Sequence, residues 1–354
     1  MSGFGGISVP DPPRSSDAYA ALDLGTNNCR LLVGTPSGHG FRVVDSFSRI
    51  VRLGEGLHHS SQLSDAGMER TILALHSCAA RLSRRPVRAV RAIATEACRR
   101  ATNGPAFLAR IRRETGLRFD VISAREEAQL AIESCAPLLR GDGRRALLFD
   151  IGGGSTELAW VRLPEDDGPP QLIGTVSLPI GVVTLVDQFG DAVFTPDGFH
   201  DMVDHVAERL WPFEDIHRIR QEITQGGVRL LGTSGTVTTL AGIALDLSRY
   251  SRAMVDGVVL TNREAASALG RLRAMGHAAL AAHPCVGPER AAFVLPGCAV
   301  FAAIHRIWPA ERIVVADRGL REGMLLKMMR EAVSHPHARD AVSATLLAAP
   351  PATA

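Results

Sequence analysis

Hydrophobic and polar positions along the chain predict two similar series of strands and helices. In the first series, short apolar runs predict three strands in the segments AYAALDLG, CRLLVGT and FRVVDSFS. Helical apolar spacing then predicts a helix over residues 64–83, with Ser64 as its cap. The remaining elements are a strand in VRAVRAIAT, a helix around 104–116, a short strand in RFDVIS, and a helix in REEAQLAIESCAPLL that begins with carboxylates, which the helix dipole favours.

The second series repeats the opening of the first. The segment ALLFDIGGGSTELAWV predicts a strand, a glycine-rich turn and a strand, and QLIGTVSLP predicts another strand. Further on we expect helices near 180–188 and 197–210, a strand, turn and helix in VRLLGTSGTVTTLAGIAL, a helix around Glu289–Trp308, a strand in RIVVA and a helix over Leu320–Arg330. In both series a strand ends in Asp-x-Gly, at Asp23 and at Asp150, 127 residues later. The repeat predicts a duplicated α/β half.

Length and composition are those of a globular protein with two domains. The chain has 354 residues, 46% of them hydrophobic and 21% charged. No uninterrupted apolar run reaches the roughly 18 residues of a membrane span, and residues 1–17 lack an apolar signal core, so we expect a flexible leader there. The net charge of +2 does not favour nucleic acid or an acidic membrane as partner. Six scattered cysteines without a C-x-x-C pair indicate buried thiols in a reducing compartment.

Three turns rich in glycine and hydroxyl residues follow predicted strands. The first loop contains Asp23, Gly25, Thr26 and Asn27; the second contains Asp150, Gly152, Gly153, Gly154, Ser155, Thr156 and Glu157; the third contains Gly232, Thr233, Ser234, Gly235 and Thr236. Successive small residues expose N–H groups that can bind an anion, and the third loop opens a helix whose N-terminus suits phosphate. Each loop alone could be an ordinary structural turn, but three in one chain favour a phosphate site.

Other catalytic patterns are absent from the sequence. It contains no P-loop, no G-x-G-x-x-G after the first strand, no G-x-S-x-G and no H-E-x-x-H. His58 and His59 have no acidic or cysteine partners at metal-ligand spacing, which indicates a solvent-facing pair. Glu126 and Glu127 are adjacent at a predicted helix start, so they point about 100° apart and one of them at most can face a given cleft. That carboxylate could act as general base toward a water, or both could simply be solvated.

A set of ordered segments resembles one protein family. ALDLGTNNCRLLV, AIATEACRRATNG, ISAREEAQLAI, LLFDIGGGSTELAW, SLPIGVV, LLGTSGTVTTLA, FVLPGCAVF and VADRGLREGML are similar to the exopolyphosphatase/guanosine pentaphosphate phosphohydrolase (Ppx/GppA) family, from about Ala18 to Met328. The resemblance implies two ribonuclease-H-like halves of the actin, sugar kinase and Hsp70 superfamily flanking a catalytic cleft. It also implies a cytoplasmic Mg²⁺-dependent hydrolase, expected as a homodimer, that acts on polyphosphate or guanosine pentaphosphate.

Family motifs assign roles residue by residue. The resemblance implies Glu127 as the catalytic carboxylate and Asp23, Asp150 and Glu157 as metal ligands. It implies phosphate binding by Arg99 and by the loop residues Gly25, Thr26, Asn27, Gly152, Gly153, Gly154, Ser155, Thr156, Gly232, Thr233, Ser234 and Gly235. The sequence departs from the family pattern at Ala292, where relatives often carry Asp, and at Asn28, where they often carry Ser.

The resemblance also predicts a domain arrangement. We expect one actin-like domain over residues 18–131 plus 318–331, a second over 132–317, and a disordered tail over 332–354. The 24 residues after Arg330 are too few for the C-terminal helical domain of long family members, so a shorter polyphosphate track is expected. Arg318 and Arg321, near the expected hinge, could contact phosphate or pair with carboxylates. An ATP-dependent kinase of the same fold and a non-catalytic alarmone-binding protein remain alternatives to hydrolysis.

Overall fold

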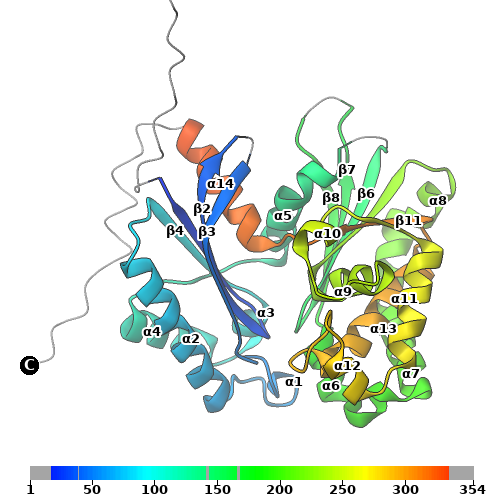
Figure 1. Ribbon diagram of the computed structural model, residues 1–354, viewed down its shortest axis with the longest axis horizontal. Helices are drawn as coiled ribbons and strands as arrows, with labels where there is room; N and C mark the ends of the chain where they lie inside the picture. The colour runs from blue at the N-terminus through cyan, green and yellow to red at the C-terminus, as the bar shows by residue number, and fades with distance from the viewer. Residues whose placement is uncertain (1–16, 39, 141–142, 166–167, 335–354) are drawn as a thin grey trace, which may run out of the picture.

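The computed structural model describes residues 17–38, 40–140, 143–165 and 168–334. Two β-sheets lie side by side, each covered by its own helices, and the last helix returns to the first sheet (Figure 1). We call the first sheet with α1–α4 the first lobe, and the second sheet with α6–α13 the second lobe. The predicted leader up to residue 16 and the predicted tail from residue 335 lie outside the described residues.

The first lobe is built on a five-stranded sheet of order β3-β2-β1-β4-β5. Its strands are β1 (Tyr19–Leu24), β2 (Asn28–Ser37), β3 (Gly40–Ile50), β4 (Ala89–Ala94) and β5 (Asp120–Val121). Its helices are α1 (Leu57–Ser60), α2 (Asp65–Ser83), α3 (Glu96–Arg100) and α4 (Gly104–Thr115). The first three strands pair antiparallel, whereas β4 and β5 continue parallel to β1. Ser64 caps α2 as expected, because its Oγ accepts the backbone N–H of Gly67 at 3.1 Å.

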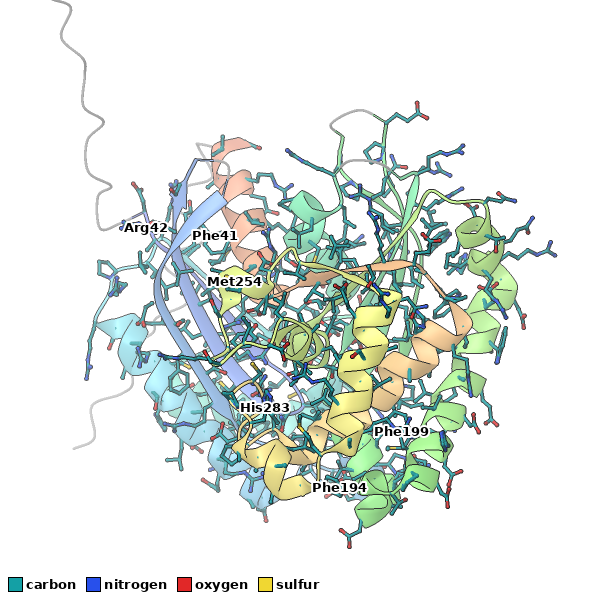
Figure 2. The ribbon with its side chains drawn as sticks, turned by 45° about the vertical axis from the view of Figure 1, so that its right-hand side comes forward. Phe41, Arg42, Phe194, Phe199, Met254 and His283 are labelled. Atoms are coloured by element: carbon teal, nitrogen blue, oxygen red, sulfur yellow. The ribbon has the colours of Figure 1, made fainter. Side chains whose placement is uncertain are left out.

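The second lobe is built on a six-stranded sheet of order β10-β11-β9-β6-β7-β8. Its strands are β6 (Arg145–Ile151), β7 (Thr156–Arg162), β8 (Gln171–Leu178), β9 (Val228–Thr233), β10 (Val259–Thr261) and β11 (Arg312–Ala316). Its helices are α6 (Val182–Phe189), η2 (Gly190–Phe194), α7 (Pro196–His217), α8 (Ile219–Thr224), α9 (Ser234–Ala244), α10 (Arg252–Val255), α11 (Asn262–Ala274), α12 (His277–Ala282) and α13 (Ala291–Ile307). At the lower end of this lobe, Phe199 packs against Arg273 and Phe194 against His277, which joins η2 and α7 to α11 and α12 (Figure 2).

The two sheets share one strand order. In each sheet, three strands pair antiparallel and two further strands run parallel to the first of them. Strands β6, β7, β8, β9 and β11 correspond in this order to β1, β2, β3, β4 and β5, and β10 is an additional strand at the edge of the second sheet. This is the order of a ribonuclease-H-like half, and its repetition confirms the duplication that the two Asp-x-Gly turns predict. The first of these turns joins β1 to β2, and the second joins β6 to β7.

Two helices fill the space between the sheets. Helix α5 (Ala124–Cys135), continued by the 3-10 turn η1 (Ala136–Leu138), and helix α14 (Leu320–Ser334) pack on each other, and α14 also packs on β1. Their apolar side chains form one buried cluster with residues of both sheets, including Ala21 and Leu148. Gly323 permits the close approach, because a Cβ there would lie 2.2 Å from the carbonyl oxygen of Leu130. The lobes are thus connected by a shared core.

Several elements differ in extent from the sequence-based expectation. The strand expected in RFDVIS is limited to Asp120–Val121, and the helix expected over 197–210 extends to His217 although Pro212 lies inside it. The six cysteines are buried and unpaired, as their scattered positions predict. None of the helices in the described ranges is both long and apolar enough to cross a membrane.

Candidate active site

The three glycine-rich loops open into one cleft between the lobes. The cleft has a volume of about 880 Å³ and is bordered by the ends of β1, β6 and β9 and by the start of α14. Its lining includes the following residues singled out in the sequence: Asp23, Gly25, Thr26, Asn27, Glu127, Asp150, Gly152, Gly153, Gly154, Ser155, Glu157, Thr233, Ser234 and Gly235. Segments more than 200 residues apart therefore meet at one site because the two halves present equivalent strand ends to each other.

The first and second loops contact each other across the cleft. A Cβ built on Gly154 would lie 2.5 Å from the Thr26 Oγ1 atom, and one on Gly153 would lie 3.1 Å from the Asn27 Cβ. Side chains at these two positions would push the loops apart, so glycine is required for the close approach. The result is a narrow floor of backbone and hydroxyl groups from both lobes.

The third loop is fixed to its neighbours by hydroxyl groups. Ser234 adopts a left-handed backbone with φ of 77° and donates its Oγ–H to the carbonyl oxygen of Ile151 at 2.8 Å. Thr233 Oγ1 donates to the carbonyl oxygen of Arg318 in the connection to α14. A non-glycine residue held at positive φ is a strained conformation of the kind found at ligand sites. It starts α9, whose first backbone N–H groups have no partner within the helix and suit a phosphate.

Glu127 enters the cleft from the first turn of α5. Ser123 begins this helix, since its Oγ accepts the Glu126 backbone N–H at 3.2 Å. The Glu127 side chain is 11% exposed and its Oε2 accepts a hydrogen bond from Arg99 Nη1 at 3.3 Å. Glu126 instead forms an ion pair with Arg91 and lines a different pocket. The prediction that one of the two adjacent carboxylates faces the cleft is therefore confirmed.

Burial and mutual repulsion raise the pKa values of the acidic groups in the cleft. Burial is the main cause that raises the pKa of Asp23, that of Asp150 to about 6 and that of Glu157 to about 7. Burial, followed by the charge of Glu157, raises the pKa of Glu127 to about 9, against the opposing effect of Arg99. The raised pKa values mean that the crowded carboxylates bind protons strongly, so the site favours a ligand that brings positive charge.

The acidic groups fit a hard cation bound together with an anion. Within the described ranges, no preformed group of three or more His, Cys, Asp and Glu side chains is arranged to hold a metal. All three of Asp23, Asp150 and Glu157 line the cleft, and their assignment as metal ligands stays a prediction. Asp150 and Glu157 lie opposite each other in the ladder between β6 and β7, and Ser177 Oγ donates a hydrogen bond to Glu157 Oε1 at 2.9 Å. The buried Asn27 Oδ1 has no hydrogen-bond partner in the part of the chain that the structure describes. Such oxygens suit Mg²⁺, which proteins usually bind through one or two carboxylates plus substrate phosphates.

A family comparison agrees with this chemistry. The model of the Ppx/GppA phosphatase family matches residues 32–332. The chain belongs to this family. The match covers nearly all of the described residues and includes the second and third loops, α5 and α14.

Solved structures of Ppx/GppA proteins have the same architecture. The crystal structure of an exopolyphosphatase-like protein is 26% identical, covers 90% of this chain and 100% of its own, and superposes with a TM-score of 0.80. The Ppx/GppA family member of Aquifex aeolicus is also 26% identical, with 90% and 99% of the two chains covered and a TM-score of 0.71. An exopolyphosphatase from Cytophaga hutchinsonii is 23% identical over 89% and 98%, with a TM-score of 0.79, and supports the fold.

Three residues expected in the Ppx/GppA site do not line the cleft. Thr156 is fully buried and donates its hydroxyl to the carbonyl oxygen of Ile180 at 2.7 Å. Gly232 packs inside the lobe, where a Cβ would meet the Phe149 ring at 2.5 Å. Arg99 pairs with Glu127 and with Glu96, the latter at 2.5 Å, so its guanidinium positions a carboxylate. The structure thus places these three residues behind the cleft lining, and their contact with phosphate stays a prediction.

Other cleft residues are not singled out by the sequence motifs. They include Arg30 on β2, Tyr250 and Arg252 beside α10, and Glu322 on α14. Arg30 lies opposite Asp23 in the ladder between β1 and β2, so strand alternation places both side chains on one face. That signal is readable from the sequence, whereas Tyr250 lies in an irregular connection and Arg252 begins the short helix α10.

Proposed function

We propose that this chain is an exopolyphosphatase that releases orthophosphate from the end of inorganic polyphosphate, and that guanosine pentaphosphate is hydrolysed to tetraphosphate at the same site. One observation carries the proposal. Glu127, a buried carboxylate in the first turn of α5, faces a cleft whose floor consists of three loops suited to phosphate. Membership in the Ppx/GppA phosphatase family supports hydrolysis over the kinase alternative.

Phosphoryl transfer to water needs an aligned nucleophile and neutralised phosphate oxygens, with little covalent help from the protein. The N–H groups of the second loop and of the α9 N-terminus bind the terminal phosphate and orient it. The Glu127 carboxylate, held by Arg99, aligns a water and accepts its proton as the water attacks the terminal phosphorus. The bond to the bridging oxygen then breaks, and the shortened chain leaves with that oxygen.

A divalent cation would be held by one or two of Asp23, Asp150 and Glu157, and when bound it supplies charge that offsets phosphate oxygens and favours ionised carboxylates. The contacts between the first and second loops keep bulk water from the reacting phosphate. The cytoplasmic location, the homodimer and the preference between the two substrates stay predictions.

Phosphate release tests the proposal. We expect orthophosphate from polyphosphate in the presence of Mg²⁺, no phosphate transfer to sugars when ATP is supplied, and loss of release in Glu127→Ala. A parallel reaction with guanosine pentaphosphate ranks the substrates. Binding of guanosine tetraphosphate without turnover of either substrate would instead support the alarmone-binding alternative, and ATP-dependent sugar phosphorylation would support the kinase.

A further inference from the structure

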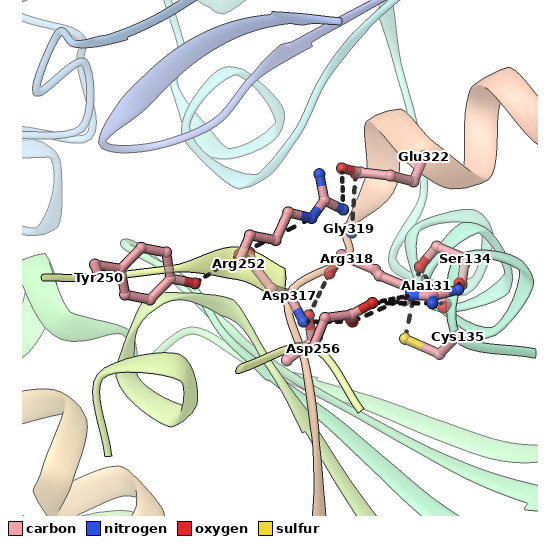
Figure 3. A network of polar contacts seen from close by, with 11 residues as sticks. Ala131, Ser134, Cys135, Tyr250, Arg252, Asp256, Asp317, Arg318, Gly319 and Glu322 are labelled. Carbon is pink, nitrogen blue, oxygen red and sulfur yellow. Dashed lines mark hydrogen bonds and ion pairs between the residues drawn. The ribbon is translucent and has the colours of Figure 1, made fainter. Parts of the chain in front are cut away.

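The arginines that line the cleft differ in whether their guanidinium groups are already bound. Arg318 binds Asp256 with contacts of 2.9–3.1 Å, and Arg252 binds Glu322 at 3.0 Å (Figure 3). Arg290 donates to the carbonyl oxygens of Cys285 and Val286 at 3.0 Å. Arg318 and Arg252 are thus paired with carboxylates near the connection from β11 to α14, whereas Arg290 is held by carbonyl oxygens of the segment before α13.

Arg321 has no such partner. It lies in the first turn of α14, is partly buried and lines the cleft, yet its guanidinium makes no hydrogen bond or ion pair with any residue of the described ranges. Burial lowers the pKa of Arg321, and the charges of Arg30 and Arg252 lower it further while Glu322 and Asp23 oppose them. A desolvated cation beside two others, without a hydrogen-bond partner among the described residues, is unfavourable. An anion entering the cleft removes this cost.

We propose that Arg321 is a substrate-binding residue whose guanidinium binds phosphate oxygens of the anionic chain in the cleft. The proposal rests on the proposed function for the identity of that anion. Because α14 packs on β1 between the lobes, Arg321 would contact the anion from the side of the first sheet, whereas the second and third loops would contact it from the second lobe. Of the two arginines near the hinge that sequence left open, Arg318 pairs with a carboxylate and Arg321 serves the ligand.

Calorimetric binding of inorganic tripolyphosphate tests this assignment. All proteins carry Glu127→Gln, so that turnover does not consume the probe. We expect Arg321→Met to weaken binding about 10-fold or more, since a charge-assisted hydrogen bond is lost. Arg321→Lys keeps the charge without the planar fork and should bind with intermediate affinity. In the background with Glu127 intact, Arg321→Met should raise KM for polyphosphate more than it lowers kcat.

Thermal unfolding separates binding from a structural role. Removing an unpaired buried cation should leave the melting temperature of Arg321→Met unchanged or higher, whereas Arg318→Met should lower it because Asp256 loses its partner. The proposal is overturned if Arg321→Met binds tripolyphosphate as tightly as the Glu127→Gln parent does. It is also overturned if the parent does not bind tripolyphosphate. If the affinity falls as expected but wild type releases no phosphate from polyphosphate, the anion-binding role stands and the proposed hydrolysis fails.

Discussion

At the scale of single residues, the surroundings of each carboxylate decide its ionisation and its role. Glu126 and Glu127 are consecutive, yet one pairs with Arg91 outside the cleft while the other is buried among carboxylates. The α-helix alone explains this, because a step of one residue rotates a side chain by about 100°. The chemistry of the site therefore depends on the register of α5, which Ser123 fixes by capping its first turn.

The buried carboxylates predict an unusual pH dependence of stability in the metal-free protein. A carboxylate whose pKa is raised by folding binds more protons in the folded than in the unfolded state. Its stabilising effect is therefore present below its ordinary pKa and lost as pH rises through the folded value. For Asp150, Glu157 and Glu127, with pKa values of about 6, 7 and 9, the loss spans about pH 4 to 9.

Urea unfolding in a chelator should thus give a lower free energy of unfolding at pH 8.5 than at pH 6. Glu157→Gln should reduce this difference by on the order of 1–3 kcal/mol, because it removes one raised pKa and relieves the repulsion that raises that of Glu127. A wild-type stability that rises over this range, or an identical pH profile in the variant, would show that these groups are ionised in the folded protein.

At the scale of elements, glycine residues allow neighbouring segments to approach closely, and these contacts position the site. The second loop meets Thr26 of the first loop at Gly154. Gly154→Ala should force these loops apart and lower kcat/KM for polyphosphate by about 10-fold or more, since small misplacements of reacting groups are costly. Steady-state kinetics measure this loss. Unchanged kinetics would mean that the Thr26 side chain moves aside and that the contact does not position the phosphate.

Two helical glycines, Gly323 in α14 and Gly270 in α11, offer a matched pair of substitutions. At Gly323 a Cβ would clash with the Leu130 backbone, so Gly323→Ala should destabilise the protein by about 1–3 kcal/mol. At Gly270, on an exposed face of α11, a Cβ meets nothing within 4 Å, so Gly270→Ala should stabilise by about 0.5–1 kcal/mol through helix propensity. Chemical denaturation measures both changes. Equal effects of the same sign would contradict the close packing of α14 on α5.

The sequence alone predicts most elements that carry a strong pattern. The two Asp-x-Gly turns predict the duplicated sheets, and the ribonuclease-H-like fold implied by the family resemblance is confirmed. The region from residue 246 to 288 is harder to predict, because α10, β10 and α12 are short and depend on tertiary packing. Gly232 and Thr156 lie within phosphate-like motifs but face the core, since motif letters do not show on which side of a strand end a residue lies.

At the scale of the whole molecule, two lobes joined through α5 and α14 permit the cleft to change its width. Arg252 connects α10 of the second lobe to Glu322 at the start of α14, and Arg318 connects the hinge to Asp256 (Figure 3). These ion pairs lie at the connection between β11 and α14, where the sequence predicts a hinge between the lobes. Closure around a ligand that both lobes contact excludes water that should not react.

Small-angle X-ray scattering can detect such closure. We expect the radius of gyration of Glu127→Gln to decrease when Mg²⁺ and tripolyphosphate are added together, because both lobes bind the same anion. The protein without ligand provides the baseline, and NaCl at matched ionic strength provides the control. An unchanged radius of gyration at saturating ligand would mean that the cleft is already in its binding geometry.

The most direct test of the account is orthophosphate release from polyphosphate by two adjacent variants. Glu127→Gln should lower kcat by about 10²–10⁴-fold, the usual contribution of a general base, while Glu126→Gln loses only a surface ion pair with Arg91 and should retain turnover near that of wild type. Both substitutions remove one carboxylate from the same helical turn, but only the Glu127 carboxylate lines the cleft. Wild-type turnover in Glu127→Gln, or equal loss in both variants, would contradict the assignment of Glu127 as the residue that prepares the attacking water.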